Sequence, residues 1–243
     1  MKRLFLALAV VSAAGLGSTA VQAQTHQHGR TVRGHVGENN VLRFQLARLT
    51  PRGEGNYWPE KELTFTGSAD DFEDLSFTLD YQRLVTNRIS VMLSAGFFEG
   101  AEDQAYLDFI DDLGNDIVHR TTLERAAFTV GLLVHPLGRD AVVSPYLGGG
   151  LGAYLWRLTE SGDFINFNVD PPFIFTDTFE DEGDAFGHYW IVGLEVPLSW
   201  SWAAFAEARW HNADQELGGA DFIGFGELDL SSREVGVGVS VSF

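Results

Sequence analysis

The 243-residue sequence contains no cysteine. This absence excludes a disulfide framework, a thiolate metal site and a cysteine nucleophile. Basic residues are scarce as well: 16 Lys and Arg stand against 34 Asp and Glu, which gives a formal net charge of -18. Proteins that bind nucleic acid rely on clustered Lys and Arg, so nucleic acid is not expected as a partner. Beyond the N-terminus, no apolar run approaches the roughly 20 residues that a membrane-spanning helix requires.

The N-terminus has the three-part layout of a secretory signal peptide. Two basic residues precede an apolar run over residues 4–16, and small residues then lead to Ala23. The run is too short to span a membrane as a helix, so we interpret residues 1–23 as a signal peptide that is cleaved after Ala23. We expect residues 24–39, which are polar, to form a periplasmic N-terminal arm, and residues 40–243 to form a single domain.

The rest of the chain is built from short segments in which apolar and polar residues alternate, which is the period of a β-strand. Eight segments show this pattern: residues 40–48, 75–82, 89–97, 122–134, 144–156, 189–196, 202–210 and 234–243. The register of the fourth is the weakest, because Leu133 interrupts its polar face. Alternating short and long connections between an even number of strands are typical of outer-membrane barrels. We therefore predict an all-β fold: a closed antiparallel transmembrane β-barrel of about eight strands, with short periplasmic turns and long extracellular loops.

The two faces of these strands favour a membrane barrel over a soluble one. A soluble barrel turns its bulky apolar side chains inward, but here the polar faces carry small residues that suit a narrow interior. In the seventh segment, Trp202 and Trp210 stand at opposite ends of the apolar face, roughly 20 Å apart along the axis of a tilted barrel. That distance is close to the height of a lipid-facing band between aromatic girdles. The predicted membrane-interface aromatics are Tyr81, Phe97, Trp190, Trp202, Trp210 and Phe243; ordinary burial of the two tryptophans is the alternative.

The polar faces also carry charged residues that would point into the lumen. They are Arg43, Asp80, Arg125, Glu195, Glu207, Arg209 and Glu234. Charges inside a narrow barrel are costly unless they are paired, and the near balance of sign makes pairing feasible. We therefore expect an ion-pair network that plugs the lumen. The alternative is that Arg125 and Glu234 lie near the rim in water.

Three stretches carry a resemblance to a known family: "PYLGGGLGAYLW", "GLEVPLSWSWAAFAEARW" and the terminal "VGVSVSF". The chain resembles the small outer-membrane β-barrel superfamily of Gram-negative bacteria, which comprises the OmpA-type transmembrane domain and the "porin family" barrels. This resemblance implies location in the outer membrane. It also implies that the strand ending at Phe243 resembles the C-terminal signal that the barrel assembly machinery reads.

Few residues suggest chemistry. Some small barrels of this superfamily act on lipid A, and such an enzyme needs a Ser close to a His on a lipid-facing strand end. The stretch "RWHNADQE" supplies His211, Asn212 and Asp214 but no Ser. We therefore expect no enzymatic activity and no cofactor.

No metal site is expected either. His26 and His28 lack a third ligand, and the acidic stretches 111–116 and 179–184 do not have the spacing of an EF-hand loop. Solvated acidic loops are the default interpretation of these stretches. A weaker hypothesis is that they bind Ca²⁺ or Mg²⁺ shared with lipopolysaccharide phosphates.

Aromatic residues in the long connections predict either a packed cap over the barrel or a recognition surface. We favour the cap, because long loops need packing of their own to be ordered. The sequence thus predicts a monomeric outer-membrane protein, in contact with membrane lipid and lipopolysaccharide, that has a structural or surface-interaction role. A narrow or gated small-solute channel is the alternative, and a lipid A-modifying enzyme is the third reading.

Overall fold

The computed structural model of the protein describes residues 39–219, 222 and 224–243. The predicted signal peptide, the two N-terminal histidines and nearly all of the predicted periplasmic arm lie outside the described residues. No helix in the described part of the chain combines the length and apolar character needed to cross a membrane.

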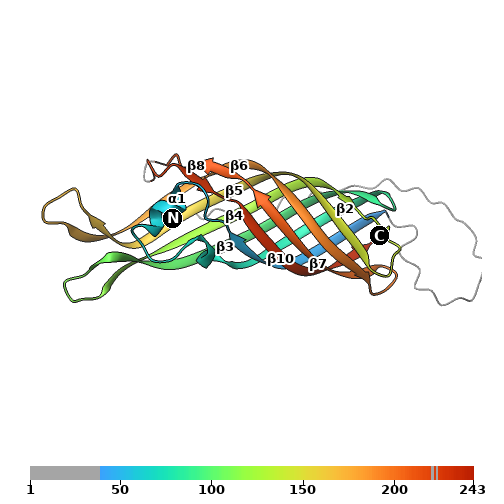
Figure 1. Ribbon diagram of the computed structural model, residues 1–243, viewed down its shortest axis with the longest axis horizontal. Coiled ribbons are helices and arrows are strands. Elements are labelled where there is room, and N and C mark those ends of the chain that lie inside the picture. Colours follow the sequence, from blue (N-terminus) through green and yellow to red (C-terminus); the bar gives the residue numbers. More distant parts are fainter. Residues whose placement is uncertain (1–38, 220–221, 223) are drawn as a thin grey trace, which may run out of the picture. The chain divides into compact units, whose positions relative to one another are not determined.

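Eight antiparallel strands close into a barrel (Figure 1). They are β1 (Asn40–Pro51), β2 (Asp74–Thr86), β3 (Ile89–Ile110), β4 (Asp116–Val134), β5 (Ser144–Asn166), β6 (Phe173–Pro197), β7 (Trp202–Asn212) and β10 (Ser232–Ser242). Each strand pairs with its neighbour in sequence, and β10 pairs with both β7 and β1. The predicted closed barrel of eight strands is confirmed.

The first and last strands form the seam of the barrel. Val41 pairs with Ser242 at one end of the seam, and Pro51 pairs with Ser232 at the other. The backbone N–H of Phe243 donates to the carbonyl of Asn40 at 2.9 Å. Within the closed ring every strand pairs on both sides, which stabilises a chain that has no disulfides.

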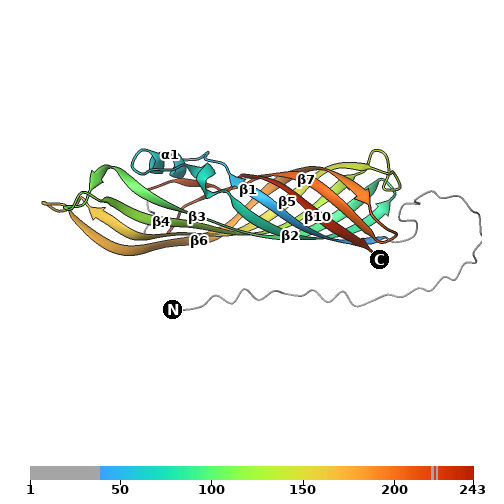
Figure 2. The same cartoon turned by 90° about the horizontal axis from the view of Figure 1, so that it is seen from below.

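Strands β3 to β6 continue far beyond the segments that the alternation predicted. The connection between β3 and β4 is a short turn at the end of a long hairpin, and so is the connection between β5 and β6 (Figure 2). The acidic stretch 179–184, interpreted from the sequence as a loop, lies within β6 and pairs with β5. The loop interpretation was wrong because polar and apolar residues are mixed on both faces of these extensions, so the sequence there shows no alternation with a period of two.

The two remaining connections at this end of the barrel are long and contain small elements of their own. The segment between β1 and β2 includes the short helix α1 (Tyr57–Glu62) and the 3-10 helix η1 (Ala69–Phe72). The segment between β7 and β10 includes β8 (Asp214–Glu216) and β9 (Glu227–Asp229), which pair with each other. Turns at the opposite end of the barrel are short.

Side chains on the barrel are arranged inside out relative to a soluble protein. Bulky apolar residues on the outer face are exposed, among them Phe44, Leu79, Leu93, Phe128, Leu151, Leu194 and Val237. Polar and charged residues face the lumen and are buried. This band of apolar residues requires lipid around it, which is the arrangement of a transmembrane barrel.

Glycines in the lumen make room for aromatic side chains from the neighbouring strand. A Cβ atom added to Gly193 would lie 2.4 Å from the Tyr146 ring, and one added to Gly238 would lie 2.3 Å from the Phe205 ring. Each glycine is the direct register partner of the aromatic residue that covers it. The glycine pattern that suggested a narrow lumen therefore allows large side chains to fill it.

Candidate functional site: the lumen and its extracellular mouth

The middle of the lumen is crossed by four charged side chains, which we call the ion cluster: Arg43, Asp80, Glu207 and Arg209. Arg43 Nη2 lies 2.5 Å from Glu207 Oε2, and Arg209 Nη2 lies 2.5 Å from Glu207 Oε1. Arg209 Nη2 also lies 2.7 Å from Asp80 Oδ2. All four residues are at least 96% buried. Two cations and two carboxylates thus compensate one another across strands β1, β2 and β7.

Two aromatic residues contact the ion cluster: Tyr146 from β5 and Phe205 from β7. The hydroxyl of Tyr146 on β5 donates to Glu207 Oε2 at 2.5 Å and accepts from Arg43 Nη2 at 2.7 Å. The Arg43 guanidinium carbon lies 4.0 Å from the centre of the Phe205 ring. Cation–π contact and hydrogen bonding lower the cost of burying these charges. Together with Tyr146, the cluster connects β1, β2 and β7 to β5.

Glu195, also on the predicted lumen list, pairs with a residue that the sequence did not single out. Arg139 Nη2 lies 2.6 Å from Glu195 Oε1. Arg139 belongs to the turn between β4 and β5, and it is buried at the short-turn end of the barrel. The lumen therefore holds four arginines (Arg43, Arg125, Arg139 and Arg209) and four carboxylates (Asp80, Glu195, Glu207 and Glu234).

Glu234 and Arg125 lie above the ion cluster and are buried, so the alternative that placed them near the rim in water was wrong. Glu234 accepts hydrogen bonds from Ser76 Oγ and lies 3.1 Å from His211 Nε2. Arg125 Nη1 donates to the hydroxyl of Ser232 at 2.7 Å and to a backbone carbonyl. The two residues bond to different partners and not to each other.

The candidate residues for a lipid A enzyme do not converge. His211 points into the lumen, where its Nδ1 lies 3.0 Å from the Tyr154 hydroxyl. Asn212 lies beside His188, at 3.4 Å, and Asp214 begins β8. His211 is thus separated from the lipid face, which is where the sequence argument required it.

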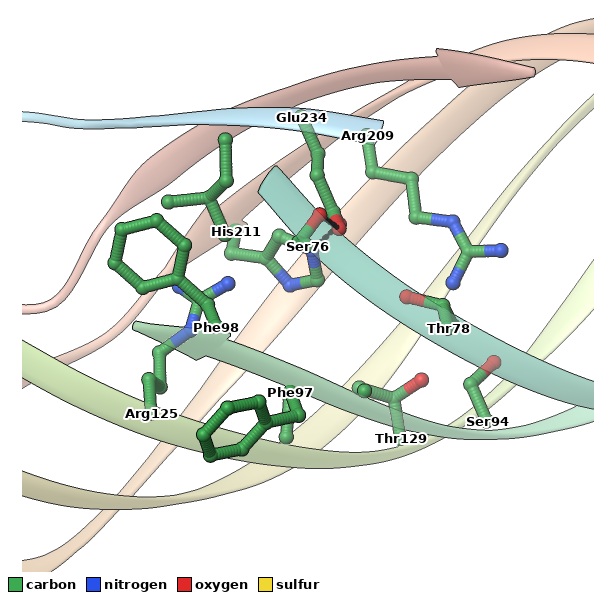
Figure 3. A pocket seen from close by; sticks show the side chains of 13 residues that line it. Ser76, Thr78, Ser94, Phe97, Phe98, Arg125, Thr129, Arg209, His211 and Glu234 are labelled. Carbon is green, nitrogen blue, oxygen red and sulfur yellow. Dashed lines mark hydrogen bonds and ion pairs between the residues drawn. The ribbon is translucent and has the colours of Figure 1, made fainter. Parts of the chain in front are cut away.

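A small cavity lies above the ion cluster (Figure 3). Its volume is about 10 Å³, which is roughly the space that one water molecule occupies. Ser94, Thr129 and Arg125 line it, and each has a buried polar atom without a hydrogen-bond partner in the described part of the protein. A solute larger than water finds no room at this level.

The mouth at the hairpin end is filled by an apolar cluster that we call the aromatic plug. It consists of Tyr57, Trp58, Ala69, Phe72, Leu217, Phe222, Leu228 and Leu230 from the two long connections, packed against Leu123, Tyr154, Trp156 and Leu158 of the barrel wall. Trp58 contacts Tyr57 and Phe72 edge to face, with ring centres 5.0 Å apart in both pairs. The predicted packed cap is confirmed for these residues.

A second buried ion pair holds helix α1 against the barrel wall. Lys61 Nζ lies 2.9 Å from Glu160 Oε1 on β5 and 3.2 Å from His119 Nε2 on β4. Tyr57 donates to the same carboxylate at 2.5 Å. Because the Lys61 ammonium donates to Nε2, His119 is held neutral with its proton on Nδ1. This site lies above the apolar outer band, and nothing in the periodicity indicated it.

We expect the hairpin end to lose stability in acid. Burial, and next the Lys61 ammonium, lower the pKa of His119 from 6.5 to about 4, while Glu160 acts in the opposite sense. Between these pH values the unfolded chain binds a proton that the folded chain does not, so the stabilisation present above pH 6.5 is lost as the pH falls toward 4. Urea midpoints from tryptophan fluorescence across this range should fall with pH in the wild type and fall less in His119→Phe. The matched control is the same change, His188→Phe, at an exposed position. Equal slopes in all three proteins would contradict the assignment.

The predicted membrane-interface aromatics all lie on the outer face. Tyr81, Phe97, Trp190, Trp202 and Phe243 are exposed, and Trp210 is partly buried beside Trp190, its register partner. Trp202 begins β7 at the short-turn end, and Trp210 lies near the opposite end of the same strand. Among the residues that the structure describes, no group of three or more His, Asp or Glu side chains is arranged to hold a metal ion.

A family model described as outer membrane protein beta-barrel domain matches residues 7–243. The chain belongs to this family. Its apolar outer band is therefore the lipid-facing surface of an integral outer-membrane barrel, and the long-hairpin end is the extracellular one. No curated protein matches the sequence.

Solved structures of other outer-membrane barrels are similar to this member of the family. OprG from Pseudomonas aeruginosa aligns over 88% of this chain and 99% of its own, with 12% identity and a TM-score of 0.54. Neisserial surface protein A aligns over 84% of this chain and 97% of its own, with 11% identity and a TM-score of 0.47. At these identities the similarity to OprG establishes the fold alone.

Proposed function

We propose that this barrel is closed to solutes and serves the outer membrane as a structural and surface-interaction protein. The observation that carries the proposal is the ion cluster, in which Glu207 joins Arg43 of β1 to Arg209 of β7 while Tyr146 of β5 bonds to the same group. The aromatic plug supports it, because it closes the extracellular mouth independently. An open pore would need a water path through both levels, and the cavity between them has a volume of only about 10 Å³.

The proposal predicts that the wild-type protein gives no stable openings in planar lipid bilayers. Removing the guanidinium groups in Arg43→Ala/Arg209→Ala should raise the conductance, because the side chains that span the lumen are shortened at the level where the barrel is closed. Tyr146→Ala widens the same level without removing a charge, and Arg120→Ala, at an exposed pair with Asp103, is the silent control. Each variant is first checked for the heat-dependent gel shift of a folded barrel.

Reproducible openings of the wild type at modest voltage would replace this proposal with the narrow or gated channel. If the wild type gives no openings and the arginine and tyrosine variants have the same conductance as the wild type, the ion cluster is not what closes the lumen.

The proposal includes no catalytic role, since His211 bonds to Glu234 and Tyr154 inside the lumen. It also includes cleavage after Ala23, a monomeric state in lipid, and recognition of the C-terminal strand by the barrel assembly machinery. The exposed Phe243 and the outward valines of β10 support the last point. Unaltered acyl chains of lipid A, measured by mass spectrometry in cells with and without the protein, are the expected result for a barrel without enzymatic activity.

A further inference from the structure

The two long extracellular hairpins expose a group of large apolar side chains, which we call the tip patch. It consists of Leu107, Phe109, Ile110 and Leu113 on the β3–β4 hairpin and Phe167, Val169, Phe173 and Ile174 on the β5–β6 hairpin. Leu113 is 87% exposed. Both hairpins reach beyond the rest of the barrel, away from the lipid-facing band (Figures 1 and 2). Lipid therefore does not account for this exposure.

The buried side chains of the aromatic plug provide a comparison for the exposed side chains of the tip patch. Tyr57, Trp58 and Phe72 come from the same end of the protein and are almost fully buried. These three aromatic side chains are covered inside the mouth, whereas those of the tip patch are not. A group of large apolar side chains that faces water marks an interaction site more often than a random surface does.

The tip patch is held in shape before any partner arrives. The rings of Phe109 and Phe167, one from each hairpin, have centres 5.1 Å apart. The backbone N–H of Ile165 donates to the Tyr106 hydroxyl at 3.1 Å, which ties β5 to β3. Asp111 accepts from the backbone N–H of Asn115 at 2.7 Å and fixes the turn. A preorganised surface loses little conformational entropy when it binds.

Charge decides which kind of partner fits the tip patch. Residues 106–118 and 161–179 contain seven aspartates and neither lysine nor arginine. The aspartates are Asp108, Asp111, Asp112, Asp116, Asp163, Asp170 and Asp177. A second copy of the chain would place this acidic surface against itself, and lipopolysaccharide phosphates or acidic polysaccharides would be repelled. A partner with positive charge beside apolar side chains is complementary in both respects.

We propose that the tip patch binds a cationic amphipathic peptide segment of an extracellular partner. This inference rests on the proposed surface-interaction role and gives it a class of partner. Apolar side chains of the segment cover Phe109, Leu113 and Phe173, and its Lys or Arg side chains face the surrounding aspartates. The barrel wall supplies a fixed platform, because both hairpins continue directly from membrane strands.

The test uses the full barrel in nanodiscs of zwitterionic phosphatidylcholine and a fluorescent synthetic peptide of alternating Lys and Leu. Fluorescence anisotropy should show saturable binding that weakens as NaCl is raised, since exposed charges are screened. A matched peptide with Glu in place of Lys should not bind, and empty nanodiscs give the background. Leu113→Ser/Phe173→Ser should weaken binding about tenfold, which corresponds to about 1.4 kcal/mol.

Leu63→Ser is the control variant, because Leu63 is as exposed as the tip residues (79%) but lies beside helix α1. Equal binding of the Lys and Glu peptides, or equal loss in the tip and control variants, would overturn the inference. Sedimentation in detergent tests the protein without peptide. Reversible dimers that the tip substitutions abolish would mean that the tip patch binds a second copy of the chain instead of a peptide.

The outcomes also separate this inference from the proposed function. A barrel that is silent in bilayers and binds no peptide would leave the closed-lumen proposal standing and remove the tip patch as a binding site. A barrel that conducts and binds the Lys peptide would remove the closed-lumen proposal and leave the tip patch as a binding site.

Discussion

Glu207→Gln lowers the free energy of unfolding by about 3–5 kcal/mol, the cost expected when one partner of a buried ion pair is neutralised. The substitution keeps the size and shape of the side chain, so packing contributes little to the effect. It leaves Arg43 and Arg209 with only Asp80 as a carboxylate partner, and Asp80 lies 3.9 Å from Arg43 Nε. Two buried guanidinium groups then share one negative charge, and neither can reach water.

Equilibrium unfolding in urea, with the barrel in lipid vesicles and tryptophan fluorescence as the signal, measures this loss. The matched control is Asp103→Asn, the same carboxylate-to-amide change at an exposed pair with Arg120, where about 0–1 kcal/mol is expected. If the two variants unfold at the same urea concentration, the ion cluster does not stabilise the barrel as described.

Trp58→Ala should destabilise the aromatic plug by about 3–5 kcal/mol, the range measured for removing a large aromatic side chain from a packed core. Trp58 is 2% exposed, packs against Tyr57 and Phe72, and donates from Nε1 to the carbonyl of Asp229 at 3.3 Å. The change therefore removes contacts that join the two long connections to each other. Because the membrane strands do not contribute to these contacts, we expect the loss to appear at the mouth first.

Limited proteolysis measures this loss. We expect faster cleavage within residues 52–73 in the variant, while the barrel keeps its heat-dependent gel shift. Leu63→Ala removes an exposed side chain from the same connection and should change stability by less than about 0.5 kcal/mol. Unchanged cleavage in Trp58→Ala would mean that the plug is held by the Lys61–Glu160 pair alone.

The membrane part of the fold was predictable because lipid on one side and a polar lumen on the other impose a strict period of two. In β10, Val235 to Val241 face outward at every odd position, as the alternation predicted. Leu133, which obscured the register of β4, is buried in the lumen against Met92 and Tyr146. The alternation failed above the membrane, because no lipid selects apolar residues for the outer face there and both faces of the extended strands mix polar and apolar residues.

The lumen residues were predictable from the same alternation, but their partners were not. The predicted set contained three arginines and four carboxylates, and the missing cation, Arg139, lies in a turn that has no periodicity. The unequal count was itself a signal, since a buried carboxylate without a partner is costly. Lys61 and His119 gave no such signal, because their pairing depends on how helix α1 enters the mouth.

The seam between β1 and β10 has a consequence for how the protein is made. Asn40 and Phe243, at the two ends of the barrel sequence, hydrogen-bond to each other, so β1 finds its second neighbour only when β10, the last barrel strand in the sequence, has been made. Contacts between such distant parts of a chain form slowly, because the loop between them must be ordered first. A nascent or truncated chain is therefore a sheet with two open edges, and it depends on protection until its final strand arrives.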